Sequence, residues 1–108
     1  MARVDVIMPL RQLLVLIFDP TPGTEPRVDE LLRSARRKAE AAGYRCWAYR
    51  NEIHPSEIAL FLEGPLPDPS EGGPAPIFGD EIGELRSLAR RFEPVRSLVE
   101  YPLEGDDA

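Results

Sequence analysis

The chain has 108 residues, of which 43% are hydrophobic and 30% are charged, and this is the length and composition of one globular domain. Its single cysteine, Cys46, and single histidine, His54, exclude an internal disulfide and any cysteine-rich or multi-histidine metal site built by one chain. Nineteen acidic residues against thirteen basic ones give a net charge of −6, which disfavours nucleic acid as a partner.

The N-terminal part of the sequence predicts neither a signal peptide nor a membrane segment. Arg3 and Arg11 flank only short apolar runs, and the longest run, residues 13–18, has the length of a strand. Asp19 and Pro20 follow that run, where a signal peptide would carry small residues. We therefore expect a cytoplasmic protein with no membrane partner.

The first predicted element of the core is a strand over residues 13–18. The run is continuously apolar and is stopped by a turn signal at residues 19–23, which is typical of a strand buried on both faces at the centre of a sheet. Residues 4–8 alternate weakly, and they predict a short edge segment or an ordered arm.

A helix is predicted from about residue 25 to about residue 42. Thr24 is its expected N-cap, Pro26 falls in the first turn, and Gly43 stands where a left-handed C-cap is expected. The residues with helical spacing that form its apolar stripe are Val28, Leu31, Leu32, Ala35, Ala39 and Ala42.

Two further strands are predicted at residues 44–51 and 58–62, joined by a short connection. The second of these is apolar on both faces, whereas the first alternates. One face of the alternating strand would carry Arg45, Trp47, Tyr49 and Asn51, and the other Tyr44, Cys46, Ala48 and Arg50.

Residues 64–79 contain five prolines and four glycines, which predicts a long mobile loop without a helix or a strand of normal length. A second helix is expected to begin at an Asp80 N-cap and to be ended by Pro94. Its apolar stripe would be Ile82, Leu85, Leu88, Ala89 and Phe92. Residues 95–101 then predict an edge strand, and the acidic tail 104–108 predicts a solvated, flexible terminus of the single domain.

The element order strand–helix–strand–strand–helix–strand predicts an α+β fold of the ferredoxin-like type. Its four-stranded antiparallel sheet would place the first and third strands at the centre, with both helices on one face. The other face would then expose about half of the apolar side chains of the central strands. Since a monomer rarely leaves such a patch exposed, we expect a homodimer in which two sheets pack face to face.

Three segments share a pattern with one family. Residues 22–24 give a proline–glycine opening before a helix, residues 43–50 a glycine and an aromatic-rich strand, and residues 58–63 a strand that ends in a glutamate. These segments resemble the dimeric α+β barrel proteins related to antibiotic biosynthesis monooxygenases. That resemblance implies the dimeric barrel fold, but family members often carry Glu-x-Trp where this chain has Glu63 followed by Gly64 and Pro65.

The candidate ligand-binding residues are Trp47, Tyr49, Asn51 and Arg45, because aromatic rings beside one or two polar groups can hold an electron-rich aromatic ligand. The alternative is that the aromatic residues fill the dimer core. Cys46 is expected to be a buried structural cysteine, and His54 an exposed turn residue. The sequence identifies no catalytic residue, and it predicts no metal and no haem, flavin or other cofactor.

Three functions remain open from the sequence. The first is a non-catalytic homodimeric module that binds a small molecule or a protein, and the second is a cofactor-independent monooxygenase acting on a quinol-like aromatic. The third is a structural or assembly role. A pocket between helices and sheet, lined by Trp47 or Tyr49 under the 64–79 loop, would favour the enzyme, and a filled interior would favour binding at the surface.

Overall fold

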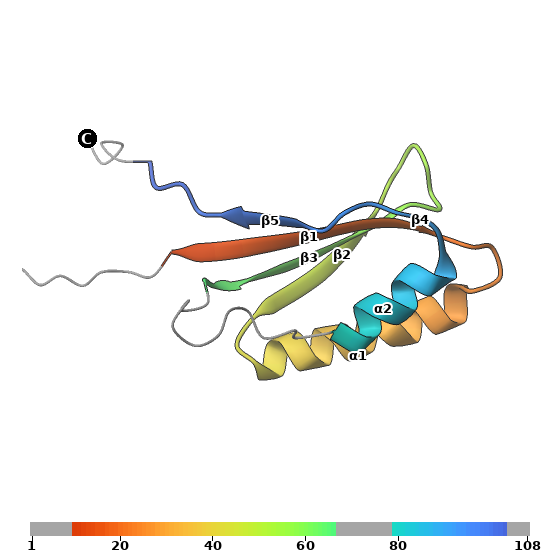
Figure 1. Ribbon diagram of the computed structural model, residues 1–108, viewed down its shortest axis with the longest axis horizontal. Helices are drawn as coiled ribbons and strands as arrows, with labels where there is room; N and C mark the ends of the chain where they lie inside the picture. The colour runs from red at the N-terminus through yellow and green to blue at the C-terminus, as the bar shows by residue number, and fades with distance from the viewer. Residues whose placement is uncertain (1–9, 67–78, 104–108) are drawn as a thin grey trace, which may run out of the picture.

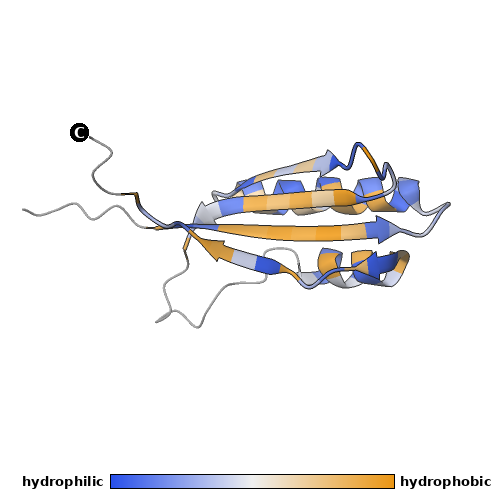
Figure 2. Ribbon diagram, turned by 90° about the horizontal axis from the view of Figure 1, so that it is seen from above, coloured by the Kyte–Doolittle hydropathy of each residue, from blue (hydrophilic) through white to orange (hydrophobic). Residues whose placement is uncertain are grey.

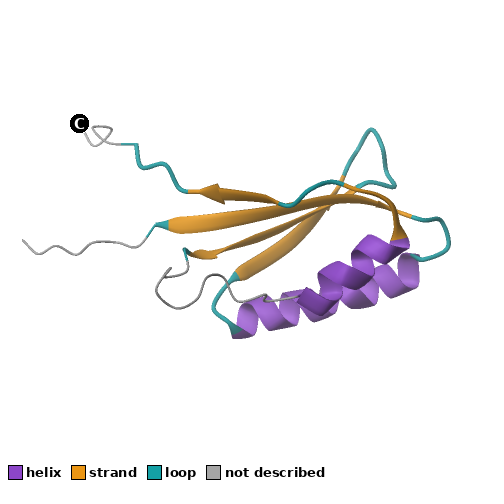
Figure 3. Cartoon of the chain, viewed as in Figure 1, coloured by secondary structure: helices purple, strands orange, loops and turns teal. Residues whose placement is uncertain are grey.

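Residues 10–66 and 79–103 are described by the computed structural model, and they form two helices and five strands. In chain order these are β1 (Arg11–Pro20), α1 (Glu25–Ala41), β2 (Arg45–Arg50), β3 (Ile58–Pro65), α2 (Gly79–Leu88), β4 (Ala89–Phe92) and β5 (Arg96–Val99) (Figure 3). The predictions for residues 4–8, for residues 67–78 of the proline-rich loop and for the tail 104–108 lie outside the described residues.

The strands form one antiparallel sheet in the order β2-β3-β1-β4, and β5 also pairs with β1. β1 and β3 are therefore central, as their continuously apolar sequences predict. β4 pairs with the end of β1, around Phe18 to Pro20, and β5 pairs with its beginning, at Gln12 to Val15. Together these two short strands take the place of the single fourth strand of the expected ferredoxin-like fold.

Helix α1 begins and ends where the sequence predicts. Pro26 lies in its first turn, and Gly43 follows its C-terminus with a φ of 85°, which is the left-handed conformation that favours glycine. Thr24 occupies the N-cap position without capping the helix through its side chain. Its hydroxyl instead donates a hydrogen bond of 2.6 Å to the carbonyl oxygen of Thr21, within the preceding turn.

Both helices cover the same face of the sheet (Figure 1). The space between them and the sheet is filled by buried apolar side chains, and Leu16, Phe18 and Ala35 have no exposed surface at all. The other buried side chains of these two adjoining clusters are Val28, Leu31, Ala39, Cys46, Leu60, Leu62 and Leu85. The interior is therefore packed by the residues whose spacing predicts it.

The predicted second helix is too long, because α2 ends at Leu88 and Ala89–Phe92 is strand β4. The chain turns back to the free edge of β1 at this point, where the carbonyl oxygen of Leu88 accepts a hydrogen bond of 2.8 Å from the amide of Thr21. Phe92 then pairs with Phe18. Backbone pairing with an otherwise open strand edge has thus outweighed the helical spacing of the apolar residues.

Two element ends also differ from the prediction. Helix α2 begins at Gly79, so Asp80 lies in its first turn and not at the N-cap. β3 continues to Pro65, past the predicted end at residue 62, because Gly64 still pairs with Gln12 of β1. The proline in this strand occupies its last position, where a missing backbone donor is tolerated.

Candidate functional site: the open face of the sheet

The face of the sheet opposite the helices carries no covering element among the described residues. Figure 2 views the molecule from this side and shows apolar residues along the central strands. Because directly paired residues of antiparallel strands share a face, the strand register assigns the apolar side chains of this open face as Leu13, Val15, Ile17, Trp47, Tyr49, Ala59, Phe61 and Leu98. Tyr49 is 64% exposed and Leu98 is 50% exposed, so the apolar part of this face is only partly covered by its own side chains. The same register also places Arg96, opposite Val15, and the paired residues Asp19 and Arg91 on this face.

An aromatic cluster occupies the β2–β3 side of the open face. The Trp47 ring stacks on Phe61 with centroids 5.6 Å apart and an angle of 15° between the planes, and Tyr49 meets Phe61 edge-on at 5.7 Å. The Arg45 guanidinium lies 5.2 Å from the centroid of the Trp47 ring, which is a cation–π contact. Three of the four predicted site residues are therefore neighbours: Trp47 and Tyr49 both contact Phe61, a residue not predicted for the site, and Arg45 contacts Trp47.

Asn51 lies apart from this cluster and closes the connection between β2 and β3. Its side-chain oxygen accepts hydrogen bonds from the backbone amides of Ile53 at 2.8 Å and His54 at 3.0 Å. Its amide nitrogen lies 3.4 Å from a carboxylate oxygen of Glu57. This is a typical asparagine turn, in which the side chain substitutes for a backbone partner. The structure thus places Asn51 in the turn and not beside Trp47 and Tyr49.

One acidic residue and two arginines form the polar end of the open face. Glu63 lies between Arg11, whose Nε is 3.4 Å from one carboxylate oxygen, and Arg45, whose Nη1 is 3.7 Å from the other. The open face therefore carries both signs of charge next to its apolar part, which is the composition of a surface able to pair with itself.

The two residues with reactive side chains lie elsewhere. Cys46 faces the helices and is 7% exposed, and burial raises the pKa of its thiol, an effect that the nearby Arg36 partly opposes. A protonated, buried thiol is a poor nucleophile, which fits the predicted structural cysteine. His54 is exposed in the β2–β3 connection. Across residues 10–66 and 79–103, no three side chains of His, Cys, Asp or Glu are grouped so that they could hold a metal ion. No helix of the described part of the chain is long and apolar enough to cross a membrane.

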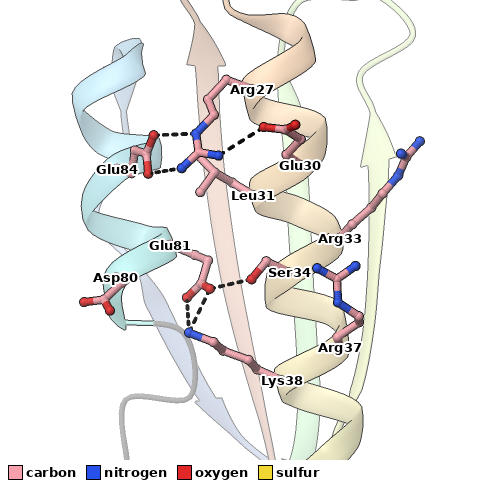
Figure 4. Close-up of a pocket in the computed structure, with 10 residues that line it drawn as sticks. All are labelled: Arg27, Glu30, Leu31, Arg33, Ser34, Arg37, Lys38, Asp80, Glu81 and Glu84. Carbon is pink, nitrogen blue, oxygen red and sulfur yellow. Dashed lines mark hydrogen bonds and ion pairs between the residues drawn. The ribbon is translucent and has the colours of Figure 1, made fainter.

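The second group of charges joins the two helices on the other side of the molecule (Figure 4). Arg27 donates to both carboxylate oxygens of Glu84, at 2.6 and 2.7 Å. Glu81 is only 5% exposed, and it accepts hydrogen bonds from Ser34 at 2.7 Å and from Lys38 at 3.2 Å. Burial alone would raise the pKa of Glu81, but these two donors outweigh it and hold the pKa below the ordinary value. The paired charges in this groove hold α1 against α2.

The chain has a ferredoxin-like α+β fold, and solved structures named antibiotic biosynthesis monooxygenases have a similar fold. Protein Rv0793 from Mycobacterium tuberculosis has 18% sequence identity and a TM-score of 0.63, and the match covers 89% of this chain and 98% of that one. A provisionally named antibiotic biosynthesis monooxygenase from Chloroflexus aurantiacus has 16% identity and a TM-score of 0.61, over 88% and 97% of the two chains.

A further solved structure, protein SO0527 from Shewanella oneidensis, has 13% identity and a TM-score of 0.65, over 88% of this chain and 95% of that one. At these identities the likeness shows the fold alone, and it confirms the predicted resemblance at that level. No family model matches the chain, and no curated protein matches it by sequence.

Proposed function

We propose that this chain is a homodimeric, non-catalytic binding module whose two subunits pack through the open faces of their sheets. The observation that carries the proposal is the apolar face opposite the helices, with Tyr49 64% exposed and Leu98 50% exposed beside half-buried Leu13 and Phe61. Soluble monomers rarely expose a continuous apolar surface of this kind, and aromatic residues are enriched in protein interfaces.

A second copy of the chain is the occupant that this face suits best. Two-fold pairing brings the same surface together twice, so each charge near the interface must find an opposite charge on the same patch. The open face provides this with Glu63 beside Arg11 and Arg45.

Light scattering across a concentration series tests the dimer. We expect the wild-type protein at tens of micromolar to have twice the chain mass, and Tyr49→Glu and Leu98→Glu to shift it toward one chain mass. Val99→Glu is the matched control, since Val99 is 47% exposed and adjoins Leu98 in β5, but the strand register places it on the helix side of the sheet. Thermal unfolding of each variant shows whether it still folds. A monomeric wild type, or a face variant that folds and stays fully dimeric, would overturn the proposal.

The second candidate is a cofactor-independent monooxygenase acting on a quinol-like aromatic. The observation that favours it is the shared fold with structures named antibiotic biosynthesis monooxygenases, together with the stacked rings of Trp47 and Phe61 beside Arg45. Oxygen uptake with a panel of quinols tests it in wild type and in a Trp47→Phe, Tyr49→Phe double variant. A rate above background that falls in the double variant supports the enzyme, and equal background rates in both support the binding module.

A further inference from the structure

A slot lies at the outer side of β2, between this strand and α1, on the helix side of the sheet. Its volume is about 330 Å³, within the range of about 300–1,000 Å³ that small organic ligands occupy. The apolar part of its lining comes from Leu32, Leu60, Cys46 and Ala48. The slot exists because β2 is the last strand of the sheet, and because the small side chain of Ala48 leaves space that a longer one would fill.

Trp47 of β2 and two arginines of α1, Arg33 and Arg36, complete the lining, which includes no acidic residue. Arg33 makes no ion pair with any residue that the structure describes. It also borders the groove between the helices, but Figure 4 shows its side chain pointing away from α2. Arg36 pairs with Glu40 at 3.1 Å in an exposed contact one helical turn along, and such a pair is weak enough to be exchanged for a ligand.

We infer that this slot binds a small aromatic carboxylate. The ring would lie against the apolar side chains of Leu32, Leu60 and Ala48, and the carboxylate would accept hydrogen bonds from Arg33 and Arg36. Guanidinium groups match the planar geometry of a carboxylate, and hydrogen bonds between charged groups are about twice as strong as neutral ones. The slot lies between α1 and the outer side of β2, and of its lining only Trp47 belongs to the open face, so the site is not built from the proposed dimer contact.

Both the aromatic ring and the carboxylate of the ligand are needed for tight binding in the slot. A neutral aromatic would cover the apolar lining without meeting the guanidinium groups. Inorganic phosphate would meet the guanidinium groups without covering Leu32 and Leu60. We therefore expect benzoate to bind with the highest affinity of the three probes, and benzyl alcohol and inorganic phosphate to bind much more weakly.

A titration of the ¹⁵N-labelled full chain with these three probes tests the order. We expect benzoate to give saturable shifts of the Cys46 and Ala48 amide signals, and to change the fluorescence of Trp47, the only tryptophan. Benzyl alcohol and phosphate should bind at least about tenfold more weakly, since each loses one class of contact. Absence of benzoate binding at millimolar concentration, or equal binding of the three probes, would overturn the inference.

Variants of α1 and β2 test where benzoate binds. The double variant Arg33→Gln, Arg36→Gln should weaken benzoate by about tenfold or more, and Ala48→Leu should fill the slot and have a similar effect. Arg37→Gln is the control, since Arg37 also lies on α1 but does not line the slot; it removes one positive charge, where the double variant removes two. Equal loss in Arg37→Gln and in the double variant would show non-specific attraction to a basic helix and would contradict the site.

The Leu98→Glu variant separates this inference from the dimer proposal. Benzoate should bind this variant as it binds the wild type, whether or not the protein dimerises. If Leu98→Glu is monomeric and loses benzoate, the site depends on the dimer and the inference is wrong as stated. If the wild type is monomeric and still binds benzoate, only the dimer proposal fails.

Discussion

Lys38 of α1 reaches across to the nearly buried carboxylate of Glu81 in α2, with 2.9 Å between the ammonium nitrogen and the nearer oxygen. Lys38 is half exposed, so one partner of the ion pair contacts solvent and the other, Glu81, is buried. A carboxylate in this position is stable only while its partner is present, because an unpaired buried charge is costly. The pair therefore decides how firmly the two helices hold together.

Removing the lysine should destabilise the protein measurably. We expect Lys38→Met to lower the free energy of unfolding, because Glu81 is left buried with only Ser34 as a side-chain donor. Arg36→Met is the control, since it breaks the exposed pair with Glu40 and should cost less than about 0.5 kcal/mol. Urea denaturation of both variants measures the difference. Equal losses of unfolding free energy in the two variants would show that the burial of Glu81 does not affect stability.

Acid should weaken the same contact. The pKa of Glu81 is held below its ordinary value of 4.5 in the folded protein, so its contribution to stability is fully present above that value. It is lost as the pH falls through the lower, folded-state pKa. We expect Glu81→Gln to lose less stability than the wild type between pH 6 and pH 3 in thermal unfolding. Glu84 and Asp19, whose pKa values are also lowered, contribute to the acid sensitivity that remains. Identical pH profiles of Glu81→Gln and the wild type would contradict the prediction.

Alanine substitutions at two glycines should change the stability of the protein in opposite directions. Gly43 has a φ of 85°, so Gly43→Ala should destabilise by about 1 kcal/mol. Gly83 lies inside α2 with open space where a Cβ would stand, so Gly83→Ala should stabilise by about 0.5–1 kcal/mol. Melting temperatures of the two variants should move in opposite directions, and a change in the same direction for both would contradict the prediction.

A third glycine is required by a neighbouring ring. The side chain of Tyr44 lies over Gly64 where a Cβ would stand, and its hydroxyl donates a 2.9 Å hydrogen bond to the carbonyl oxygen of Pro65. We expect Gly64→Ala to destabilise by about 1–3 kcal/mol, since ring and strand must move apart. The cost should shrink in a Tyr44→Ala background. A double-mutant cycle measures this coupling, and additive losses would refute the contact.

Much of the fold follows from local patterns. The apolar runs at residues 13–18 and 58–62 predict the central strands, and Pro26 and Gly43 predict the ends of α1, because these signals are carried by the residues themselves. The end of α2 does not follow, since Leu88 and Phe92 continue the helical spacing. Only the position of Phe18 and the open edge of β1 show that the chain leaves the helix.

The candidate sites divide in the same way. Alternation along β2 correctly brings Trp47 and Tyr49 to one face, but it also assigns Asn51 there, and the turn hydrogen bonds of Asn51 are not visible in the alternation. The arginines of the slot beside β2 could not be predicted, because Arg33 and Ala48 come to line one pocket only through the packing of a helix on a sheet edge. Spacing along one element predicts faces, whereas sites between elements depend on tertiary packing.

Two short strands, β4 and β5, pair with the same edge of β1, and they protect the two halves of β1 unequally from solvent exchange. β4 is anchored, because Phe92 stacks on buried Phe18 at 6.0 Å, so releasing it would expose the core to solvent. All four residues of β5 are exposed, and Pro94 in the joining segment has no amide to donate. Local unfolding at this edge should therefore begin at β5 and stop at Phe92, so that backbone amides near Gln12 exchange with solvent while those near Phe18 stay protected.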